Sequence, residues 1–509
     1  MNNHVTADII IIGAGAAGLM AAYGAAGMKA TGSKAAEGAG CKVLVLEKMP
    51  RPGRKIMITG KGRCNFTNVK PWNEFSQHIH PKPNFLKPSF YNLTSEKMID
   101  FLAEQGMESV VERGDRAFPA SHLASDVVDA LLRAAEGAGA EVLCGKEVSE
   151  VSQTKEFTIK CSDGSSYSCR KLIICTGGLS YPKTGSTGDG YKWAVQMGHS
   201  IKTLFPSLTA IVPVGYKVLG PLTPLTPAPM GQPLADQHPK NRQIFGDPDQ
   251  HPKNRQIFGD PDQHPKNRQI FGDPGGGMSI PSIAPKTKGH IDRSTPLSET
   301  GKMLCGNQMK NVGLSLVIDG NTAVDEFGDM DFTDGGIEGP IGFKVSRKCV
   351  NSIINGSKVY AVIDLKPAVD LEDLTVRINT LWNEIAKDKR SANKLYKDRF
   401  KVLLTKVLPM QLIPAFIKLN PNVDHKSLPK ALKNWKMEIE GYVGYERCVV
   451  TAGGVSQEEV SPKTLESRLT KGLYFAGEVL DLDADTGGYN LQTAFSTGYL
   501  AGISAAKEL

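Results

Sequence analysis

The residues whose types and spacing could do chemistry begin near the start of the chain, in Asp8–Met20 (DIIIIGAGAAGLM). Its four consecutive isoleucines predict a strand buried on both faces, as in the centre of a parallel sheet. The run Gly13-Ala14-Gly15-Ala16-Ala17-Gly18 follows at once and opens an alanine-rich helix. In such a run the first glycine permits a tight turn, the second lets backbone approach a pyrophosphate, and the third permits close helix packing. The motif therefore predicts a dinucleotide-binding strand–turn–helix.

A second predicted strand, Lys42–Leu46 (KVLVL), ends in the acid Glu47. A carboxylate there can accept the ribose hydroxyls of an adenine dinucleotide. Gly18 and Glu47 are 29 residues apart, whereas about 20 is usual. We interpret the excess, residues 29–40, as a surface insertion between helix and strand, because loop closure becomes only slowly costlier with length. The alternative is an ordinary βαβ unit with a glycine-rich turn.

The segment Met49–Asn68 holds a second group of motifs, GRK at residues 53–55 and GKGRCNFTN at residues 60–68. Guanidinium groups suit phosphate oxygens, so basic residues here would lie along a pyrophosphate. The segment resembles the HI0933-like flavoprotein family, which includes aminoacetone oxidase and bile-acid reductase-like NAD(P)/FAD-dependent oxidoreductases. The resemblance continues in Arg116–Ser121, Ser180–His199, and LYFAGEVLDLD and TGGYNLQTAFSTGYLAG near the C-terminus.

This resemblance implies FAD as the cofactor, with the pyrophosphate at residues 13–18 and the flavin near residues 477–490. The implied cofactor-binding residues are Gly13, Ala14, Gly15, Ala16, Ala17, Gly18, Glu47, Lys48, Arg54, Lys55, Gly60, Arg63, Cys64, Asn65, Gly177, Gly178, Gly477, Glu478, Asp481, Gly487, Gly488 and Asn490. A helix opening at Tyr489 would direct its positive end at the N1/O2 edge of the flavin, where reduced flavin is negative. Gly498 and Gly502 would let this helix pack closely on the sheet.

Two sequence features leave alternatives open. Cys64 could form an adduct or disulfide beside the flavin, but a small buried residue is the simpler interpretation. The loop Arg116–Ser121 either approaches the cofactor or forms a strand-to-helix turn capped by Ser121. Tyr489, Cys64 and His199 are candidate proton donors, so no catalytic residue is assigned. Two positions depart from the family pattern: Glu338 stands where Ser is usual, and Ala484 where Gly is common.

The implied fold class is α/β, a Rossmann-like FAD-binding domain of the two-dinucleotide-binding-domain flavoprotein type with an inserted β-rich plus helical lobe. We expect residues 1–205 and 436–509 to form the FAD-binding domain, with short antiparallel strands within residues 141–174. Residues 206–370 would form the β-rich domain and 371–435 a small basic helical domain, with helical spacing from Leu371 to Glu440. Three copies of DQHPKNRQIFGDP start at Asp236, Asp249 and Asp262, inside a Pro- and Gly-rich stretch at about 221–290. Their identity and prolines predict a disordered loop.

Composition limits the function classes. The chain has 509 residues, enough for two or three domains, and lacks the run of about 20 apolar residues that crosses a bilayer. Nine cysteines without CxxC or zinc spacing indicate reduced thiols, a cytoplasmic location and no metal site. Of the net charge of +7, residues 371–440 contribute +6, from 14 Lys/Arg and 8 Asp/Glu. This stretch is either a solvated basic face or a footprint for an anionic partner.

The resemblance therefore predicts an FAD-dependent oxidoreductase that reduces a C=C or C=N bond in a small molecule or an RNA base. With a single dinucleotide fingerprint, NAD(P)H would dock transiently as reductant. We expect no membrane or DNA partner. The first alternative is a flavin oxidase that oxidises an amine with oxygen. The second is a flavin-bound RNA-binding or assembly factor without turnover.

Overall fold

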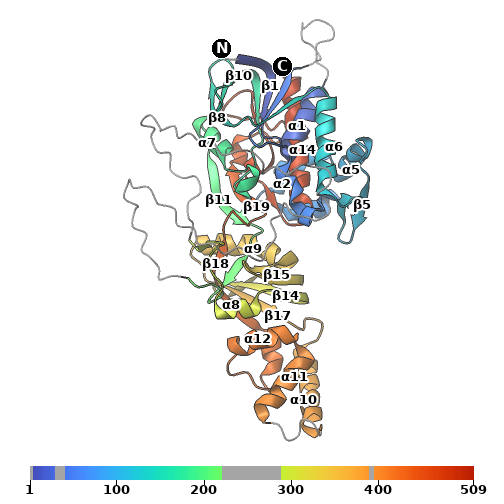
Figure 1. Ribbon diagram of the computed structural model, residues 1–509, viewed down its shortest axis with the longest axis vertical. Coiled ribbons are helices and arrows are strands. Elements are labelled where there is room, and N and C mark those ends of the chain that lie inside the picture. The colour runs from blue at the N-terminus through green and yellow to red at the C-terminus, as the bar shows by residue number, and fades with distance from the viewer. Residues whose placement is uncertain (1–3, 29–40, 220–287, 389–394) are drawn as a thin grey trace, which may run out of the picture. The chain divides into compact units, whose positions relative to one another are not determined.

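The computed structural model describes residues 4–28, 41–219, 288–388 and 395–509 (Figure 1). These residues belong to one compact unit, built from Met1–Leu219 and Ile283–Leu509. The predicted surface insertion at 29–40 and the three tandem repeats at 236–274 lie outside the described residues. None of the helices in the described part of the chain is long and apolar enough to span a membrane.

A seven-stranded sheet carries the predicted dinucleotide-binding motif. Its order is β7-β2-β1-β10-β9-β8, with β20 paired to the end of β10. The strands are β1 (His4–Ile12), β2 (Val43–Glu47), β7 (Glu141–Cys144), β8 (Val148–Gln153), β9 (Phe157–Cys161), β10 (Ser166–Ile174) and β20 (Leu473–Phe475). Strands β7, β2, β1, β10 and β20 are parallel, whereas β8 and β9 are antiparallel. The antiparallel strands predicted within 141–174 are thus confirmed for β8 and β9, whereas β7 is parallel to β2.

The register of the parallel strands positions the site. Ile12 at the end of β1 lies opposite Leu46 of β2 and Ile174 of β10. Because the carboxyl ends of parallel strands meet at one edge of a sheet, the turns that follow these three strands lie together there. Residues Ile9–Ile12 are at most 4% exposed, as the predicted central strand requires.

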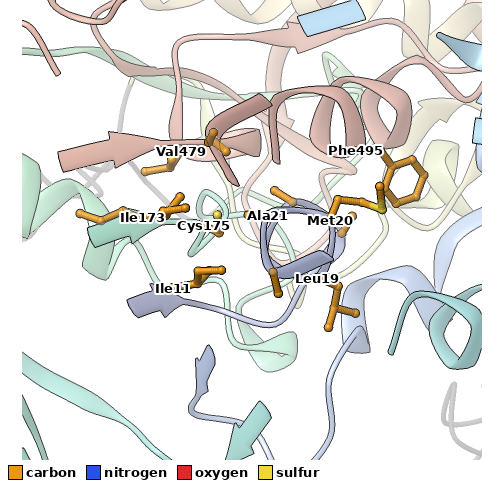
Figure 2. Packing of buried hydrophobic residues seen from close by; sticks show 14 of the residues in the cluster. Ile11, Leu19, Met20, Ala21, Ile173, Cys175, Val479 and Phe495 are labelled. Atoms are coloured by element: carbon orange, nitrogen blue, oxygen red, sulfur yellow. The ribbon is translucent and has the colours of Figure 1, made fainter. Parts of the chain in front are cut away.

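Two helices pack against each other beside this sheet, α1 (Ala16–Ala26) and α14 (Tyr489–Lys507). Figure 2 shows Met20 of α1 beside Phe495, with Leu19 and Ala21 on other sides of the same helix and Ile11 on a neighbouring strand. A Cβ at Gly498 would lie 2.1 Å from the carbonyl oxygen of Ala17, and one at Gly502 would lie 2.2 Å from that of Ala21. The two glycines therefore permit close contact with α1, whereas the sequence interpretation had them facing the sheet.

The remaining elements before residue 210 connect these parts. They are α2 (Arg54–Met57), β3 (Thr67–Asn68), α3 (Trp72–Phe75), β4 (Ile79–His80), α4 (Pro83–Asn92), α5 (Ser95–Glu104), β5 (Ser109–Glu112), β6 (Arg116–Pro119), α6 (Ala124–Gly137), α7 (Asp189–Gln196) and β11 (Ile201–Ser207). Helix α6 follows the loop Arg116–Ser121. Its N-cap is Leu123 rather than Ser121, whose hydroxyl instead donates to Asp126 in the first turn. The prediction that Ser121 caps this helix was therefore wrong.

The inserted lobe is a closed barrel. Its six strands are β12 (Ile211–Pro213), β16 (Gly336–Glu338), β15 (Asn321–Thr333), β14 (Gln308–Ile318), β17 (Val359–Asp364) and β18 (Trp435–Val443). Because β12 pairs with both β16 and β18, the ring of strands closes, and β13 (His290–Ile291) adds to β18. Helix α9 (Gly339–Ile354) packs against every strand of the ring and contributes Val345, Cys349 and Val350 to its core. Helix α8 (Glu299–Leu304) precedes β14.

The helical part lies between β17 and β18 in the chain. It comprises α10 (Leu371–Lys387), α11 (Tyr396–Val407), α12 (Ile413–Leu419) and α13 (Leu428–Lys433). The predicted apolar faces are confirmed, since Leu374 and Ile378 of α10 and Leu403 of α11 are buried. The helical reading up to Glu440 was wrong, because Trp435–Val443 forms strand β18. Its alternating buried and exposed residues at first fit the period of two of a strand.

Candidate functional site

A cavity of about 990 Å³ opens at the carboxyl edge of the parallel strands. Its wall includes the turn after β1, the end of β2, the segment at 53–65, the start of α14, and residues 331–344 of the inserted lobe. A volume of this size is at the upper end of ordinary small-molecule and cofactor sites. The site is thus shared by the parallel sheet and the barrel.

The glycines of the first turn have the three different constraints that the motif predicts. Gly13 has φ +100°, and a Cβ there would lie 2.6 Å from the carbonyl oxygen of Cys175. A Cβ at Gly18 would lie 1.8 Å from the carbonyl oxygen of Gly13. At Gly15 a Cβ would meet no described atom within 4 Å, although Gly15 lines the cavity as the N-cap of α1. The space in front of Gly15 is therefore part of the cavity, where unpaired N–H groups and the helix dipole favour an anion.

Glu47 joins the end of β2 to this turn. Its carboxylate accepts a hydrogen bond of 2.7 Å from the backbone N–H of Ala14 and one of 2.8 Å from that of Met49. Burial raises the pKa of Glu47 above its usual value, while these N–H groups oppose the shift. The carboxylate lines the cavity beside the glycine turn, as a ribose-binding acid requires.

Lys55 of α2 forms a polar cluster with the C-terminal part of the chain. Its ammonium lies 2.8 Å from Glu478 Oε2 and 2.8 Å from the hydroxyl of Ser180. Glu478 also accepts hydrogen bonds from Ser180 Oγ and from the backbone N–H of Thr451. Burial alone would raise the pKa of Glu478, but Lys55 and these donors outweigh it, so the pKa is lowered. Lys55 and Glu478 both line the cavity as an ion pair.

Most of the residues predicted from the sequence meet in the cavity wall. They are Gly13, Gly15, Ala16, Ala17, Glu47, Lys48, Arg54, Lys55, Gly60, Arg63, Asn65, Gly177, Gly477, Glu478, Gly487, Gly488 and Asn490. Five others do not line the cavity: Ala14, Gly18, Cys64, Gly178 and Asp481. Ala14 and Gly18 belong to the glycine turn, and a Cβ at Gly178 would collide with Thr451 and Glu478.

Cys64 is a buried residue, and burial raises the pKa of its thiol to about 12. Since each pKa unit lowers the thiolate fraction about tenfold, its alkylation in the native protein should be at least about 100-fold slower than that of a free cysteine. We expect iodoacetamide pulses near pH 8, followed by peptide mass spectrometry, to label the partly exposed Cys305 well before Cys64. Rapid labelling of Cys64 would instead support a reactive thiol beside the cofactor.

Asp481 lies behind the wall, where burial and the nearby carboxylate of Asp483 raise its pKa to about 6. The folded chain therefore keeps a proton that the unfolded chain loses at about pH 3.9, so stability from this group is lost as the pH rises from about 4 to about 6. We expect Asp481→Asn to increase the free energy of unfolding by about 1–3 kcal/mol near pH 7.5 and to have little effect near pH 4. Urea denaturation of the apoprotein at the two pH values measures this, and an equal effect at both would contradict it.

Of the three candidate proton donors, none lies in the cavity wall. Tyr489 is buried and its ring stacks on His78, with the ring centroids 4.3 Å apart. The imidazole of His199 is buried against Ser467 and Glu459, and burial lowers its pKa. Like the buried Cys64, Tyr489 and His199 are enclosed by other side chains and do not face the cavity.

Several wall residues were missed by the sequence reasoning. Thr176 and Thr493 are two of them: their hydroxyls, like the side-chain carbonyl of the predicted Asn65, are buried polar atoms without a hydrogen-bond partner among the described residues. Thr176 follows β10 directly, and Thr493 lies one helical turn after Tyr489, so a check of strand ends and helix starts could have found both. Arg116 and Phe118 also line the wall, which supports the cofactor-side reading of their loop.

The inserted lobe contributes Asp331, Thr333, Glu338 and Phe343 to the wall. Glu338, where the family pattern has Ser, makes two hydrogen bonds with the guanidinium of Arg447, of 2.5 Å and 3.0 Å. Arg447 also pairs with Asp334. The extra carboxylate is therefore compensated by an arginine 109 residues further along the chain.

The residues present fit a bound dinucleotide. The open space at Gly15 would be filled by a side chain, and the three buried polar atoms in the wall have no internal partner among the described residues. Arg54 lines the cavity and would supply positive charge for phosphates, and Glu47 would supply an acceptor for ribose hydroxyls. Among the described residues, no group of three or more His, Cys, Asp or Glu side chains is arranged to hold a metal.

The fold and the cavity define a Rossmann-type flavoprotein with an inserted β-barrel lobe. The sequence model of the HI0933-like protein Rossmann domain matches residues 7–504. The chain belongs to the HI0933-like family, and it is an FAD-dependent oxidoreductase. The resemblance inferred from the motifs is confirmed.

Two curated relatives are similar over nearly their whole length. The chain is 28% identical to the ribosomal RNA dihydrouridine synthase of Escherichia coli (strain K12), over 97% of this chain and 96% of the relative. It is 27% identical to the 3-dehydro-bile acid delta(4,6)-reductase of Clostridium scindens, over 98% of each chain. Among solved structures, the open conformation of a flavocytochrome c3 fumarate reductase matches with a TM-score of 0.41 and 14% identity, over 99% of this chain and 78% of that one.

Proposed function

We propose that this protein uses NAD(P)H to reduce an unsaturated C=C or C=N bond in a small molecule or an RNA base. The observation that carries the proposal is the shared cavity, in which the turn at Gly13–Ala17, the start of α14 and the wall at 331–344 face one space. The names of the two kinds of relative support it, since one is a reductase and the other makes dihydrouridine, a uridine saturated at C5–C6.

Each part of the wall has a role in this proposal. The N-terminus of α1 and the neighbouring Arg54 bind phosphate, and Glu47 binds the ribose. The N-terminus of α14, with Gly487 and Gly488, would stabilise negative charge on a reduced flavin held in the cavity without reorganisation. FAD held there would supply hydride transfer from the reductant to the substrate. The residues of the inserted lobe orient the substrate and exclude water.

The reductant has no fingerprint of its own. The glycine-rich Gly185–Gly190 stretch follows a loop rather than a strand, and its residues Gly185, Ser186 and Asp189 line the same cavity. Asp189 forms an ion pair of 2.9 Å with Lys48 of that wall. We therefore expect the nicotinamide cofactor to dock transiently in this same cavity.

Anaerobic mixing of the yellow protein with NADH and then NADPH, followed near 450 nm, tests the proposal. Loss of the flavin absorbance within seconds supports a nicotinamide-driven reductase. If the protein stays yellow but is bleached by an amine and recoloured by oxygen, it is an oxidase. Salt-sensitive RNA binding without turnover would favour the RNA-binding or assembly role.

The substrate class needs a second comparison. We would give the reduced protein either a steroid enone or ribosomal RNA from cells that lack the enzyme, and follow reoxidation of the flavin without oxygen. Reoxidation by only one of them assigns the substrate class. If neither reoxidises the flavin but oxygen does, the oxidase alternative takes its place.

A further inference from the structure

Two histidines surround Asp485, the residue directly before the cavity-lining Thr486. His78 Nδ1 lies 2.9 Å from Asp485 Oδ2, and His80 Nε2 lies 3.2 Å from Asp485 Oδ1. The carboxylate is 19% exposed, and both of its oxygens face a ring nitrogen. The residues come from opposite ends of the chain, because 407 positions separate His78 from Asp485.

The backbone strengthens this connection. The N–H of Asp485 donates a 3.0 Å hydrogen bond to the carbonyl oxygen of His78. Strand β21 (Asp483–Ala484) pairs with β4, which contains His80. On the other side of the turn, the His78 ring stacks on Tyr489, the first residue of α14, at an interplanar angle of 24°. Residues 78–80 therefore hold both ends of the turn Thr486–Gly488.

One side chain of α14 bridges this turn: Asn490 accepts a hydrogen bond from the backbone N–H of Ala484 and donates to the carbonyl oxygens of Ala484 and Asp485. Gly487 and Gly488 have φ values of +129° and +97°, in the region that favours glycine. Gly488 is the N-cap of α14, so a capping side chain is missing at this position and the first N–H groups have no partner within the helix. The direction of these N–H groups thus depends on Asn490, on Asn68, which donates to the carbonyl oxygen of Gly487, and on the group around Asp485.

The carboxylate is also held in its charged form. Burial acts to raise the pKa of Asp485, but the hydrogen bonds from His78 and His80 outweigh it and lower the pKa to about 2. At neutral pH the two rings are therefore fixed by an ionised acceptor, and hydrogen bonds to a charged partner are stronger than neutral ones.

We infer that His78 and His80, acting through Asp485, are positioning residues that direct the N-terminus of α14 so that the protein binds reduced FAD more tightly than oxidised FAD. The inference deepens the proposed function and rests on FAD occupying the cavity. A dipole stabilises charge only when it is aligned before the charge develops. Loss of this support would weaken binding of reduced flavin more than binding of oxidised flavin.

The test compares three variants with wild type in the FAD-loaded protein. His78→Phe keeps an aromatic ring against Tyr489 but removes the bond to Asp485, and Asp485→Asn removes the charge. His425→Phe is the matched control. His425 also stacks on an aromatic ring, that of Trp382 with centroids 4.5 Å apart, and also makes a hydrogen bond, with the Tyr396 hydroxyl. It lies in the helical part. The readouts are the midpoint potential, from titration against a reference dye, and thermal unfolding of the apoprotein.

We expect His78→Phe and Asp485→Asn to lose about tenfold in the preference for reduced over oxidised FAD, a decrease of about 30 mV for a two-electron couple. His425→Phe should leave the potential unchanged. The sign separates positioning from simple charge, since neutralising an anion near the flavin would by itself raise the potential. A raised or unchanged potential in Asp485→Asn overturns the inference, as does an unchanged potential in His78→Phe.

Folding and cofactor failures give different results. If His78→Phe does not fold, the single variants His80→Gln and Asp485→Asn are compared with wild type by the same measurement of midpoint potential. If wild-type protein binds no FAD, the proposed function fails before the potentials are compared. If it binds FAD and the variants keep the wild-type potential, only the positioning role fails.

Discussion

Replacing Gly15 with valine is expected to yield a folded protein that no longer retains FAD. The backbone of Gly15 has φ −81° and ψ −168°, which a β-branched residue adopts without strain. The new side chain would meet no described atom near its Cβ and would project into the cavity where phosphate is expected. We expect FAD to bind at least roughly 100-fold more weakly, a loss of about 2.7 kcal/mol. The apoprotein should unfold within about 1 kcal/mol of wild type.

Gly18→Ala is the matched control, with the opposite pattern. Its Cβ would lie 1.8 Å from the carbonyl oxygen of Gly13, so backbone must move before the helix can pack. We expect a loss of stability of about 3 kcal/mol or more, seen in circular dichroism melting even without cofactor. Absorbance near 450 nm after gel filtration measures the bound flavin in both variants. A fully loaded yellow Gly15→Val protein would contradict the placement of the pyrophosphate.

Replacing Arg347 with methionine is expected to cause a large loss of stability. Arg347 of α9 makes two hydrogen bonds, of 2.8 Å and 3.0 Å, with Asp483, whose side chain is 0% exposed. Removing the arginine leaves a buried carboxylate without its partner, which typically costs about 3–5 kcal/mol. Urea denaturation of the apoprotein measures the change in the free energy of unfolding.

Two further variants make this result specific. Lys344→Met removes an ion pair from the same helix, but Lys344 and Glu326 have partly exposed side chains, so we expect a loss of at most about 1 kcal/mol. In Arg347→Met/Asp483→Leu both charges are absent, and most of the lost stability should return because a buried pair often exchanges with apolar residues at little cost. Equal losses in the Arg347 and Lys344 single variants would show that burial of Asp483 does not set the effect.

The sequence alone determined the parts of this protein that depend on short stretches of chain. Four isoleucines, three spaced glycines and an acid at the end of the next strand specify the dinucleotide turn, because each needs only local backbone geometry and burial. The same holds for the start of α14 at Tyr489, after two glycines with positive φ. Cofactor class followed from these local motifs and from the family resemblance that they carry.

The tertiary structure decided the parts that join distant residues. The pairs Glu338–Arg447 and Lys55–Glu478 are 109 and 423 residues apart, so no local period indicates them. Strand β18 was misread as helix because its partners, β12 and β17, lie far from it in the chain. Such polar pairs form, and the barrel closes, only when segments distant in the sequence have folded against each other. The sequence therefore defined the motifs expected to bind the cofactor, whereas the folded chain determined which carboxylates and arginines line the cavity.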